Sequence, residues 1–463
     1  MLRSTSFLIA LCLAGTASAD DAPSAASADM NKSAAPSARV VTLAEAIQTA
    51  RTNAPAVHVA QAQAQVADAT RLRSESSLLP SLTGTANYLR TQANLIPRPG
   101  STNIPRATTA DGMQATSPML NADHNNKFYN SFQFGLTASM LLYDFQGSIN
   151  RFRSAKEARE AARDRAKAAE LTSDLNVRTA FFQARVTRAL VSVAKETLDN
   201  NQRHLDQIQA FVTVGTRPEI DLAQTRTDYA NARVQLVQAE NDYAISKATL
   251  LRYMGVADSL DFEVADEQIA PVQDEGSELD LLLRKALVDR PDVSALSRDL
   301  KSYELQENGA KSGFAPAITG TTQLTAGGIE LGDIRYNVAA GVGVTWPLLS
   351  GTVIADLRAA RANRAVTQAS IADIQLSVRL QIEQARLGLV AAIAADEAAG
   401  EALENARVRH RLAEGRYEAG VGNVIELGDA QVALTTAESQ AVQAENNIST
   451  ARAQLLSALG RVQ

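Results

Sequence analysis

Residues 132–143 read FQFGLTASMLLY, and apolar side chains occupy every second position of this stretch. Residues 338–348, VAAGVGVTWPL, alternate in the same way, while LTGTANYL from Leu82 and ITGTTQLT from Ile318 alternate more weakly. A period of two is typical of β-strands, because successive side chains point to opposite faces of a sheet. The sequence therefore predicts four short strands, each with an apolar and a polar face.

Two environments produce such alternation, a half-buried soluble sheet and a membrane β-barrel. The polar face consists of Gly, Thr, Ser and Gln, and the stretches are close to the about 9–11 residues with which a tilted strand crosses a bilayer. Tyr88, Tyr143 and Trp346 are available for an aromatic girdle. We therefore favour membrane strands. Four strands cannot close a barrel, and an open edge in lipid leaves backbone amides unpaired, so the barrel must be shared between subunits.

An internal duplication organises the whole chain. Residues 237–241 and 442–446 both read VQAEN, and at the same offset of 205 Gly215 falls on Gly420. An offset of 236 aligns further landmarks of the earlier part, namely Leu43, Pro55, Pro80 and Gly84 with Leu279, Pro291, Pro316 and Gly320. A fixed offset sustained over this length predicts two copies of one structural unit.

The predicted repeats are residues 42–256 and 279–463, joined by an acidic linker at 257–278. Thr42, with a Glu three residues later, has capping-box spacing, so a helix should begin there. The first repeat also contains residues 93–127, which are rich in Pro, Thr and Asn and show neither a helical nor a strand period. We expect this stretch to be a long exposed loop.

Long helices should fill the rest of each repeat. Residues 148–214 contain neither Gly nor Pro, and at 1.5 Å per residue one continuous helix of this length spans about 100 Å. Its apolar residues recur at spacings typical of coiled-coil packing. Gly215 and Gly420 follow such helices, and glycine there adopts the left-handed backbone that ends a helix and lets the chain reverse. Each repeat is thus predicted to be a strand pair followed by a helical hairpin.

The N-terminus has the features of an exported protein. Residues 1–19 combine Arg3, a short apolar run and a small-x-small cleavage site, typical of a secretory signal, and residues 20–41 resemble a flexible leader. The only cysteine, Cys12, lies within the signal, and the four histidines lack ligand spacing, so we expect no metal site and no cofactor. The net charge of −6 argues against a nucleic-acid partner, and the sequence has no catalytic motif, so we do not expect an enzyme.

At these motifs the chain resembles the TolC-like outer-membrane efflux protein family, or outer membrane factors. The resemblance covers nearly the whole mature chain and includes the junctions LLYDFQG at 141–147 and LLSG at 348–351, the Tyr417–Gly420 turn, and the tails LLRYMG and LLSALG. It implies an α+β membrane protein, a homotrimer whose three copies, with four strands each, form one 12-stranded barrel in outer-membrane lipid. A long coiled-coil-like helical tunnel would continue the barrel into the periplasm.

The resemblance also implies a function. Members are passive exit ducts of tripartite efflux or type I secretion systems, supplied by an inner-membrane transporter through a periplasmic adaptor, or membrane fusion protein. The family docks its adaptor at the hairpin turns. These tips correspond here to six residues: Val214, Gly215, Thr216, Ala419, Gly420 and Val421.

The family's gate lies near the same turns. Tyr417 matches a tyrosine that ties the second hairpin to the first, with Asp221 as its carboxylate partner. The arginine that forms a second tie in the family is replaced by Gly422, and Arg217 is available to replace it from the first hairpin.

Glu426 and Asp429 match the family's acidic ring around the narrowest point. They are three residues apart and share one face of a helix, so threefold symmetry would gather six carboxylates around an axis that attracts cations. A simpler explanation is also open, because acidic residues in the first turn of a helix are favoured by the helix dipole without any channel.

A second function class fits part of the pattern. A secreted coiled-coil structural or adhesive protein, with its strands in a soluble head, would also combine long helices with short alternating strands. Such a protein would be soluble in buffer and would not conduct ions, whereas a duct would require detergent and form channels. The sequence does not distinguish drugs, metal ions or proteins as cargo.

Overall fold

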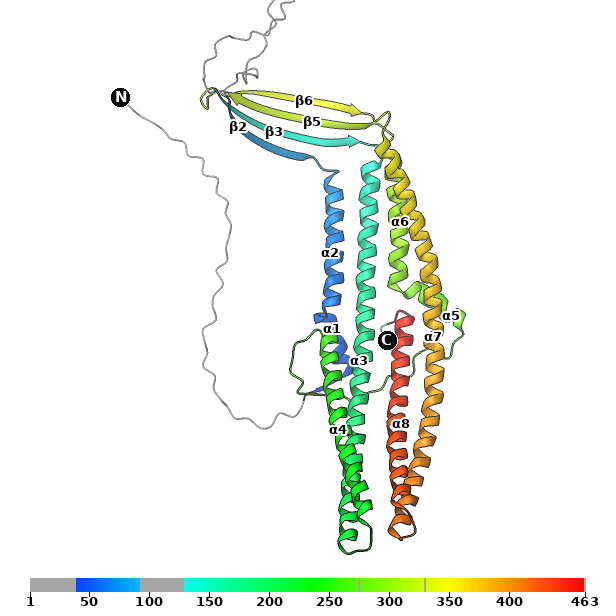
Figure 1. Ribbon diagram of the computed structural model, residues 1–463. Helices are drawn as coiled ribbons and strands as arrows, with labels where there is room; N and C mark the ends of the chain where they lie inside the picture. Colours follow the sequence, from blue (N-terminus) through cyan, green and yellow to red (C-terminus); the bar gives the residue numbers. More distant parts are fainter. Residues whose placement is uncertain (1–38, 92–128, 274, 329, 462–463) are drawn as a thin grey trace, which may run out of the picture. The chain divides into compact units, whose positions relative to one another are not determined.

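The computed structural model describes residues 39–91, 129–273, 275–328 and 330–461 (Figure 1). The predicted signal at 1–19, nearly all of the leader at 20–41 and the predicted loop at 93–127 lie outside the residues that the structure describes.

The two halves of the chain contain the same series of elements. The first half comprises α1 Leu43–Asn53, α2 Pro55–Ser76, β2 Ser81–Thr91, β3 Tyr129–Tyr143, α3 Gly147–Thr213 and α4 Glu219–Met254. The second half comprises α5 Leu279–Asp289, α6 Pro291–Ser312, β5 Ala317–Gly328, β6 Arg335–Thr345, α7 Gly351–Glu418 and α8 Val424–Ala458. The strand pairs and hairpins agree with the sequence analysis, whereas α2 and α6 were not foreseen.

Local sequence explains where several helices begin. The Thr42 hydroxyl accepts a hydrogen bond from the amide of Glu45 at 3.2 Å, which caps α1 as predicted. Pro55 and Pro291 each occupy the start of the next helix, where the missing amide costs nothing and the fixed φ suits a helix. The helix α3 has 67 residues without interruption, as the absence of Gly and Pro predicted.

The four long strands form one antiparallel sheet in the order β2-β3-β5-β6. Residues directly opposite one another in an antiparallel sheet share a face. Leu136 pairs with Leu324, and Leu324 with Val338, so the apolar positions of neighbouring strands are aligned. On the other face Gly135 pairs with Thr325. The sheet is therefore amphipathic, as the alternation predicted.

Neither face of this sheet is covered by a helix in the described part of the chain (Figure 1). Its apolar face remains exposed, with Leu136 at 43% and Val342 at 69% of full exposure. A monomer in water would leave this surface unburied, which is unusual for a soluble domain. Among the described residues, no helix has the length and apolar character that crossing a membrane requires.

The helices lie side by side in two sets that share α3 and α7. Near the sheet the contacts run α2–α3–α6–α7, and farther away they run α4–α3–α8–α7 (Figure 1). Two apolar clusters hold the helices together where the two sets meet. One surrounds Phe181 and Leu250, and the other surrounds Ile382 and Leu455. Burial of large side chains supplies most of this stability.

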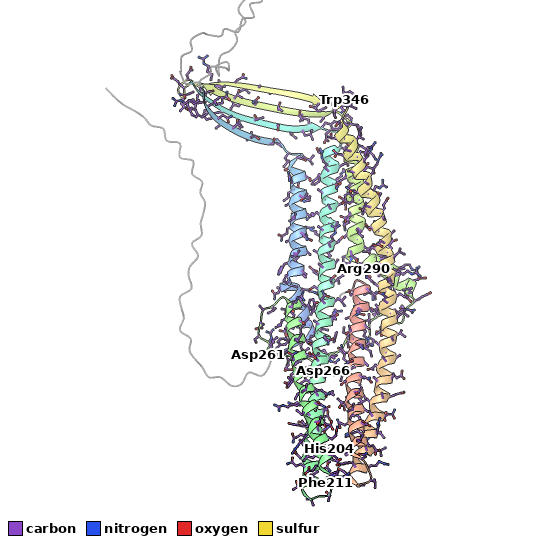
Figure 2. All side chains as sticks on the ribbon, in the orientation of Figure 1. His204, Phe211, Asp261, Asp266, Arg290 and Trp346 are labelled. Carbon is purple, nitrogen blue, oxygen red and sulfur yellow. The ribbon has the colours of Figure 1, made fainter. Side chains whose placement is uncertain are left out.

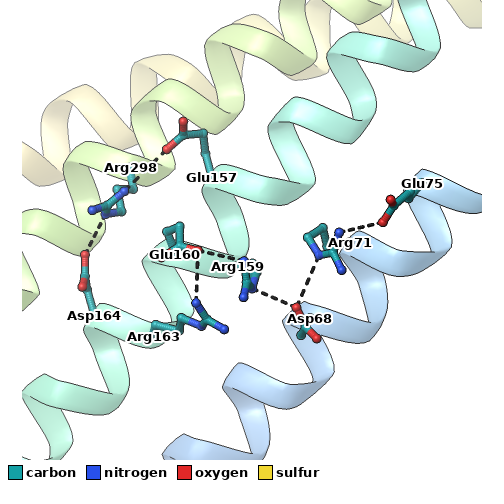
Figure 3. A network of polar contacts seen from close by, with 9 residues as sticks. All are labelled: Asp68, Arg71, Glu75, Glu157, Arg159, Glu160, Arg163, Asp164 and Arg298. Atoms are coloured by element: carbon teal, nitrogen blue, oxygen red, sulfur yellow. Dashed lines mark hydrogen bonds and ion pairs between the residues drawn. The ribbon is translucent and has the colours of Figure 1, made fainter.

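Ion pairs link α2, α3 and α6 above these clusters. Arg159 of α3 reaches Asp68 of α2 at 2.8 Å, and Arg298 of α6 reaches Glu157 and Asp164 of α3 at 3.8 and 2.8 Å (Figure 3). Because such partly exposed pairs stabilise by only about 0–1 kcal/mol each, they fix the register of the helices more than they add stability.

The linker at 257–278 is bound to both repeats. Its short strand β4, Phe262–Val264, pairs with β1, Arg39–Val41. Arg185 of α3 bridges Asp266 of the linker and Glu445 of α8. Arg452 of α8 donates to the carbonyl of Ile269 at 2.9 Å. The linker thereby connects the first hairpin to the second near the middle of the helices.

Candidate functional site: the two hairpin turns

The two hairpin turns are built in the same way. Gly215 and Gly420 have left-handed backbone, with φ of 79° and 75°. The amide after each glycine donates back to the last helical turn, from Thr216 to Phe211 and from Val421 to Arg416, both at 3.0 Å. This hydrogen bonding satisfies carbonyls that a helix end would otherwise leave free, and it requires a residue that tolerates positive φ. The predicted left-handed conformation of both glycines is confirmed.

An apolar cluster joins one hairpin to the other just above these turns. It comprises Ile208, Ala413, Tyr417, Leu427 and Ala430, with Val212, Leu222 and Val424 packed against them. Ile208 belongs to the first hairpin, while Tyr417 and Leu427 belong to the second. The turns therefore cannot separate without exposing this cluster to water.

Tyr417 is the largest side chain of the cluster and is 2% exposed. The guanidinium of Arg217 lies 4.7 Å from the centre of its ring, within cation–π distance. The arginine that the sequence analysis considered as a replacement tie is thus brought to the tyrosine from the first hairpin. Asp221 also lies close enough to influence this group electrostatically.

The Tyr417 hydroxyl is buried and finds no hydrogen-bond partner among the described residues. No hydrogen bond to Asp221 is formed. Burial raises the pKa of Tyr417, the Asp221 carboxylate raises it further, and the Arg217 guanidinium lowers it. A buried hydroxyl without a partner costs about 1–3 kcal/mol, so the ring rather than the hydroxyl holds the two hairpins together.

A side chain at Gly422 would not fit unless the neighbouring backbone shifted. A Cβ atom on Gly422 would lie 2.8 Å from the backbone nitrogen of Tyr417 and 2.9 Å from the carbonyl carbon of Arg416. The amide of Gly422 donates to the Arg416 carbonyl at 2.8 Å. Close backbone approach therefore explains the glycine.

The two predicted ring carboxylates lie on the exposed side of α8. Glu426 stands in the first turn of α8 and pairs with Arg416 of α7 at 3.4 Å. Asp429 lines a cavity of about 360 Å³ formed by α3, α4 and α8, which Asp228 also lines. Within one chain these acids do not form a ring. Arg416 was missed by the sequence analysis, since no local pattern marks a partner across a turn.

The predicted tips are accessible. Val214 and Val421 are 78% and 71% exposed, and Gly215, Thr216, Ala419 and Gly420 are also exposed. In the part of the chain that the structure describes, no group of three or more His, Cys, Asp or Glu side chains is placed to bind a metal ion. The site consists of contacts between helices of the two hairpins.

An amphipathic sheet with no cover, followed by long helical hairpins that meet at their turns, defines a class of outer-membrane channel. A family model described as outer membrane efflux protein matches residues 46–256 and 282–461. The chain belongs to this family. It is an outer-membrane channel of efflux pumps and not an enzyme, and the alternative of a secreted coiled-coil protein is wrong.

Relatives of this kind share about a quarter of their residues with the chain. The toluene efflux pump outer membrane protein TtgF of Pseudomonas putida is 26% identical over 370 residues, which cover 77% of this chain and 75% of the relative. The pyoverdine export outer membrane protein OpmQ of Pseudomonas aeruginosa is 24% identical over 416 residues, with 86% and 80% covered.

Solved structures show the same fold. The CmeC outer membrane channel of Campylobacter jejuni matches with a TM-score of 0.75 at 17% identity, covering 90% of this chain and 85% of CmeC. The MtrE outer membrane channel of Neisseria gonorrhoeae, in its open state, matches with a TM-score of 0.71 at 19% identity, covering 94% and 95%. The predicted fold of long helices with four antiparallel strands per chain is confirmed.

Proposed function

We propose that three copies of this chain complete one 12-stranded barrel in the outer membrane, and that their helices continue it as a tunnel in the periplasm. The observation that carries the proposal is the pair of free sheet edges. With four antiparallel strands, β6 runs opposite to β2. The β6 edge of one copy can therefore pair antiparallel with β2 of the next, and identical head-to-tail contacts close a ring.

Barrel size favours three copies over two. Eight strands enclose an interior that side chains fill, so a dimer would leave no duct. Twelve strands leave room for a pore lined by the Gly, Thr, Ser and Gln face, while the apolar face contacts lipid.

The outer helices support the same head-to-tail arrangement. At one edge of the helix layer, α2 exposes Val66 and α4 exposes Val237. At the other edge, α7 exposes Leu376, Leu380 and Val390. An exposed apolar series on both edges is expected when each copy covers its neighbour.

Two adjacent alanines of β6 test the barrel. Ala340 pairs with Thr322 on the apolar face, and Ala339 pairs with Gln323 on the polar face. Arginine on the lipid face near mid-membrane costs about 2–4 kcal/mol. We expect Ala340→Arg to abolish membrane insertion, and Ala339→Arg to insert and lower cation conductance in planar bilayers. Native mass spectrometry in detergent should count three subunits. Equal behaviour of both variants, or a stable monomer, would contradict the proposal.

The hairpin turns form the periplasmic entrance in this proposal. Tyr417 and Arg217 hold the hairpins of one copy together, Asp221 lies beside them, and Glu426 and Asp429 of three copies surround the axis. The exposed tips contact a periplasmic adaptor, which connects the duct to an inner-membrane transporter. The relatives named above serve toluene and pyoverdine export, two very different compounds, so we propose that the pump rather than the wall selects the cargo.

The acidic ring has its own test. Glu426→Gln combined with Asp429→Asn should lower cation selectivity and weaken block by divalent cations, because six carboxylates are removed from the axis. Glu401→Gln with Glu404→Gln removes two exposed acids of α7 at the same spacing and serves as the control. Unchanged selectivity in the first pair would remove Glu426 and Asp429 from the entrance.

A further inference from the structure

His204 is a residue of the hairpin contact to which the sequence assigned no role. It belongs to α3, close to the turn and one helical turn before the fully buried Ile208 (Figure 2). Its imidazole lies edge-on against the ring of Tyr417, with ring centres 5.3 Å apart. His204 therefore contacts the second hairpin through the same aromatic ring that Arg217 contacts.

The surroundings of this imidazole disfavour a positive charge. His204 is half-buried and lies against the buried Tyr417 ring, which Arg217 also contacts. Protonation would place a positive charge in this poorly hydrated contact, and removing a charge from water costs free energy.

Groups that favour the charged imidazole are present on α4, α7 and α3 itself. Asp228 of α4 and Glu414 of α7 favour the charged imidazole, and so does the side chain of Gln207 on α3. Burial outweighs them, and the pKa of His204 is lowered from its ordinary value. In the closed contact the neutral imidazole is thus the preferred form.

We propose that His204 is a further positioning residue of the entrance, which packs against Tyr417 while neutral and weakens the contact between the hairpins when protonated. This inference rests on the proposed function, in which the turns form the entrance. Because the histidine is less basic in the packed state than in the separated state, separation gains stability as protons bind. The contact is strongest above the ordinary histidine pKa of about 6.5 and weakens as pH falls through that value.

Planar-bilayer recordings at about pH 7.5 and about pH 5.5, on either side of the ordinary histidine pKa, test the inference. We expect the open probability of the unmodified channel to rise severalfold at the lower pH. His204→Gln keeps a polar side chain that cannot be protonated, so its open probability should be nearly independent of pH. The exposed histidine of α2 provides the control, and His58→Gln should respond as the unmodified channel does.

The recordings are repeated with Glu426→Gln and Asp429→Asn present, so that the acidic residues proposed for the entrance cannot cause the response. The response should persist in that background. A response that survives in His204→Gln, or is absent from the unmodified channel, overturns the inference. A protein that forms no channels at either pH contradicts the proposed function instead, so the two failures are distinguishable.

A direct titration covers the case in which His204→Gln does not assemble. NMR of histidine ring carbons in labelled full-length protein gives the pKa of each imidazole, and assembled His58→Gln, His124→Gln and His410→Gln assign their own signals, which leaves the fourth signal to His204. The His204 signal should titrate below the ordinary histidine pKa of about 6.5. A value at or above that pKa for His204 would overturn the inference.

Discussion

The two hairpin turns have the same backbone but different side chains, and the difference shows how a duplicated unit can form an asymmetric contact. Both turns reverse through a left-handed glycine whose following amide donates back to the last helical turn, and the second turn adds a hydrogen bond from Gly422 to Arg416. The first then continues with Arg217 and Pro218, and the second with Gly422 and Asn423. In the first turn the Arg217 guanidinium reaches across to the Tyr417 ring of the second hairpin. In the second turn the chain passes so close to its own helix that a side chain would not fit unless the neighbouring backbone shifted.

The same asymmetry holds one turn earlier in the helices. Tyr417 of the second hairpin corresponds, at the repeat offset of 205, to Val212 of the first. The larger ring fills the space between hairpins, and the smaller side chain packs at the edge of the same cluster. The two repeats thus share one backbone arrangement, and the contact between the hairpins depends on side chains that differ between the repeats.

Removal of the aromatic ring should have the largest effect. Tyr417→Ala deletes a fully buried ring, for which a loss of about 3–5 kcal/mol is typical. We expect hydrogen exchange to accelerate in the first turns of α8 and resting conductance to rise. Val212→Ala, the matching position of the first hairpin, should have a clearly smaller effect. Equal effects of the two substitutions would show that the repeats contribute symmetrically.

A methyl group at Gly422 should have the next largest effect. The added Cβ would collide with the backbone of Arg416 and Tyr417, and overpacking of this kind costs about 1–3 kcal/mol. Gly428→Ala is the matched control, because nothing lies within 4 Å of a Cβ there and alanine favours the helix. The melting temperature of the assembled protein should fall only for Gly422→Ala. A fall for both variants would contradict the crowded second turn.

Removal of the positive charge of Arg217 should weaken the hairpin contact less than either change above. Arg217→Met retains an unbranched side chain but removes the charge over the Tyr417 ring, a contact that stabilises by about 0.5–2 kcal/mol. Hydrogen exchange near Tyr417 should accelerate moderately. Arg226→Met, at an exposed position of α4, provides the comparison. If both substitutions leave exchange unchanged, Arg217 does not hold the second hairpin.

The smallest loss is expected from Tyr417→Phe, which should not weaken the hairpin contact. Its hydroxyl has no hydrogen-bond partner in the described structure, so its removal should relieve the cost of about 1–3 kcal/mol that an unpartnered buried hydroxyl carries. Resting conductance should stay close to that of the unmodified channel. A large increase in conductance would mean that the hydroxyl is bound in the assembled protein, with Asp221 as the nearest candidate.

The strands and turns were predictable because their signals are local. A period of two identifies the strands of residues 132–143 and 338–348, and glycine at 215 and 420 identifies the reversals. The helix α2 gave a much weaker signal, since it is rich in alanine and only Val57 of it is buried. Its helical period is therefore almost invisible in the sequence.

The site was only partly predictable for a different reason. Tyr417 and the position of Gly422 were found through the family resemblance, but the contact of His204 with Tyr417 joins residues more than two hundred positions apart. Neither residue lies in a local pattern that points to the other. Contacts of this kind depend on how α3 and α7 are placed in three dimensions, which spacing along the chain does not encode.

The pairing of β4 with β1 means that covalent continuity between the halves is dispensable in principle. Residues 257–261 are mostly exposed and precede β4, so a cut there leaves β1 in one fragment and β4 in the other. The bridge from Arg185 to Glu445 and the hydrogen bond between Ser154 and Ser302, 2.9 Å long, also cross between fragments. A gene divided at this point would encode two polypeptides that carry complementary surfaces for reassociation.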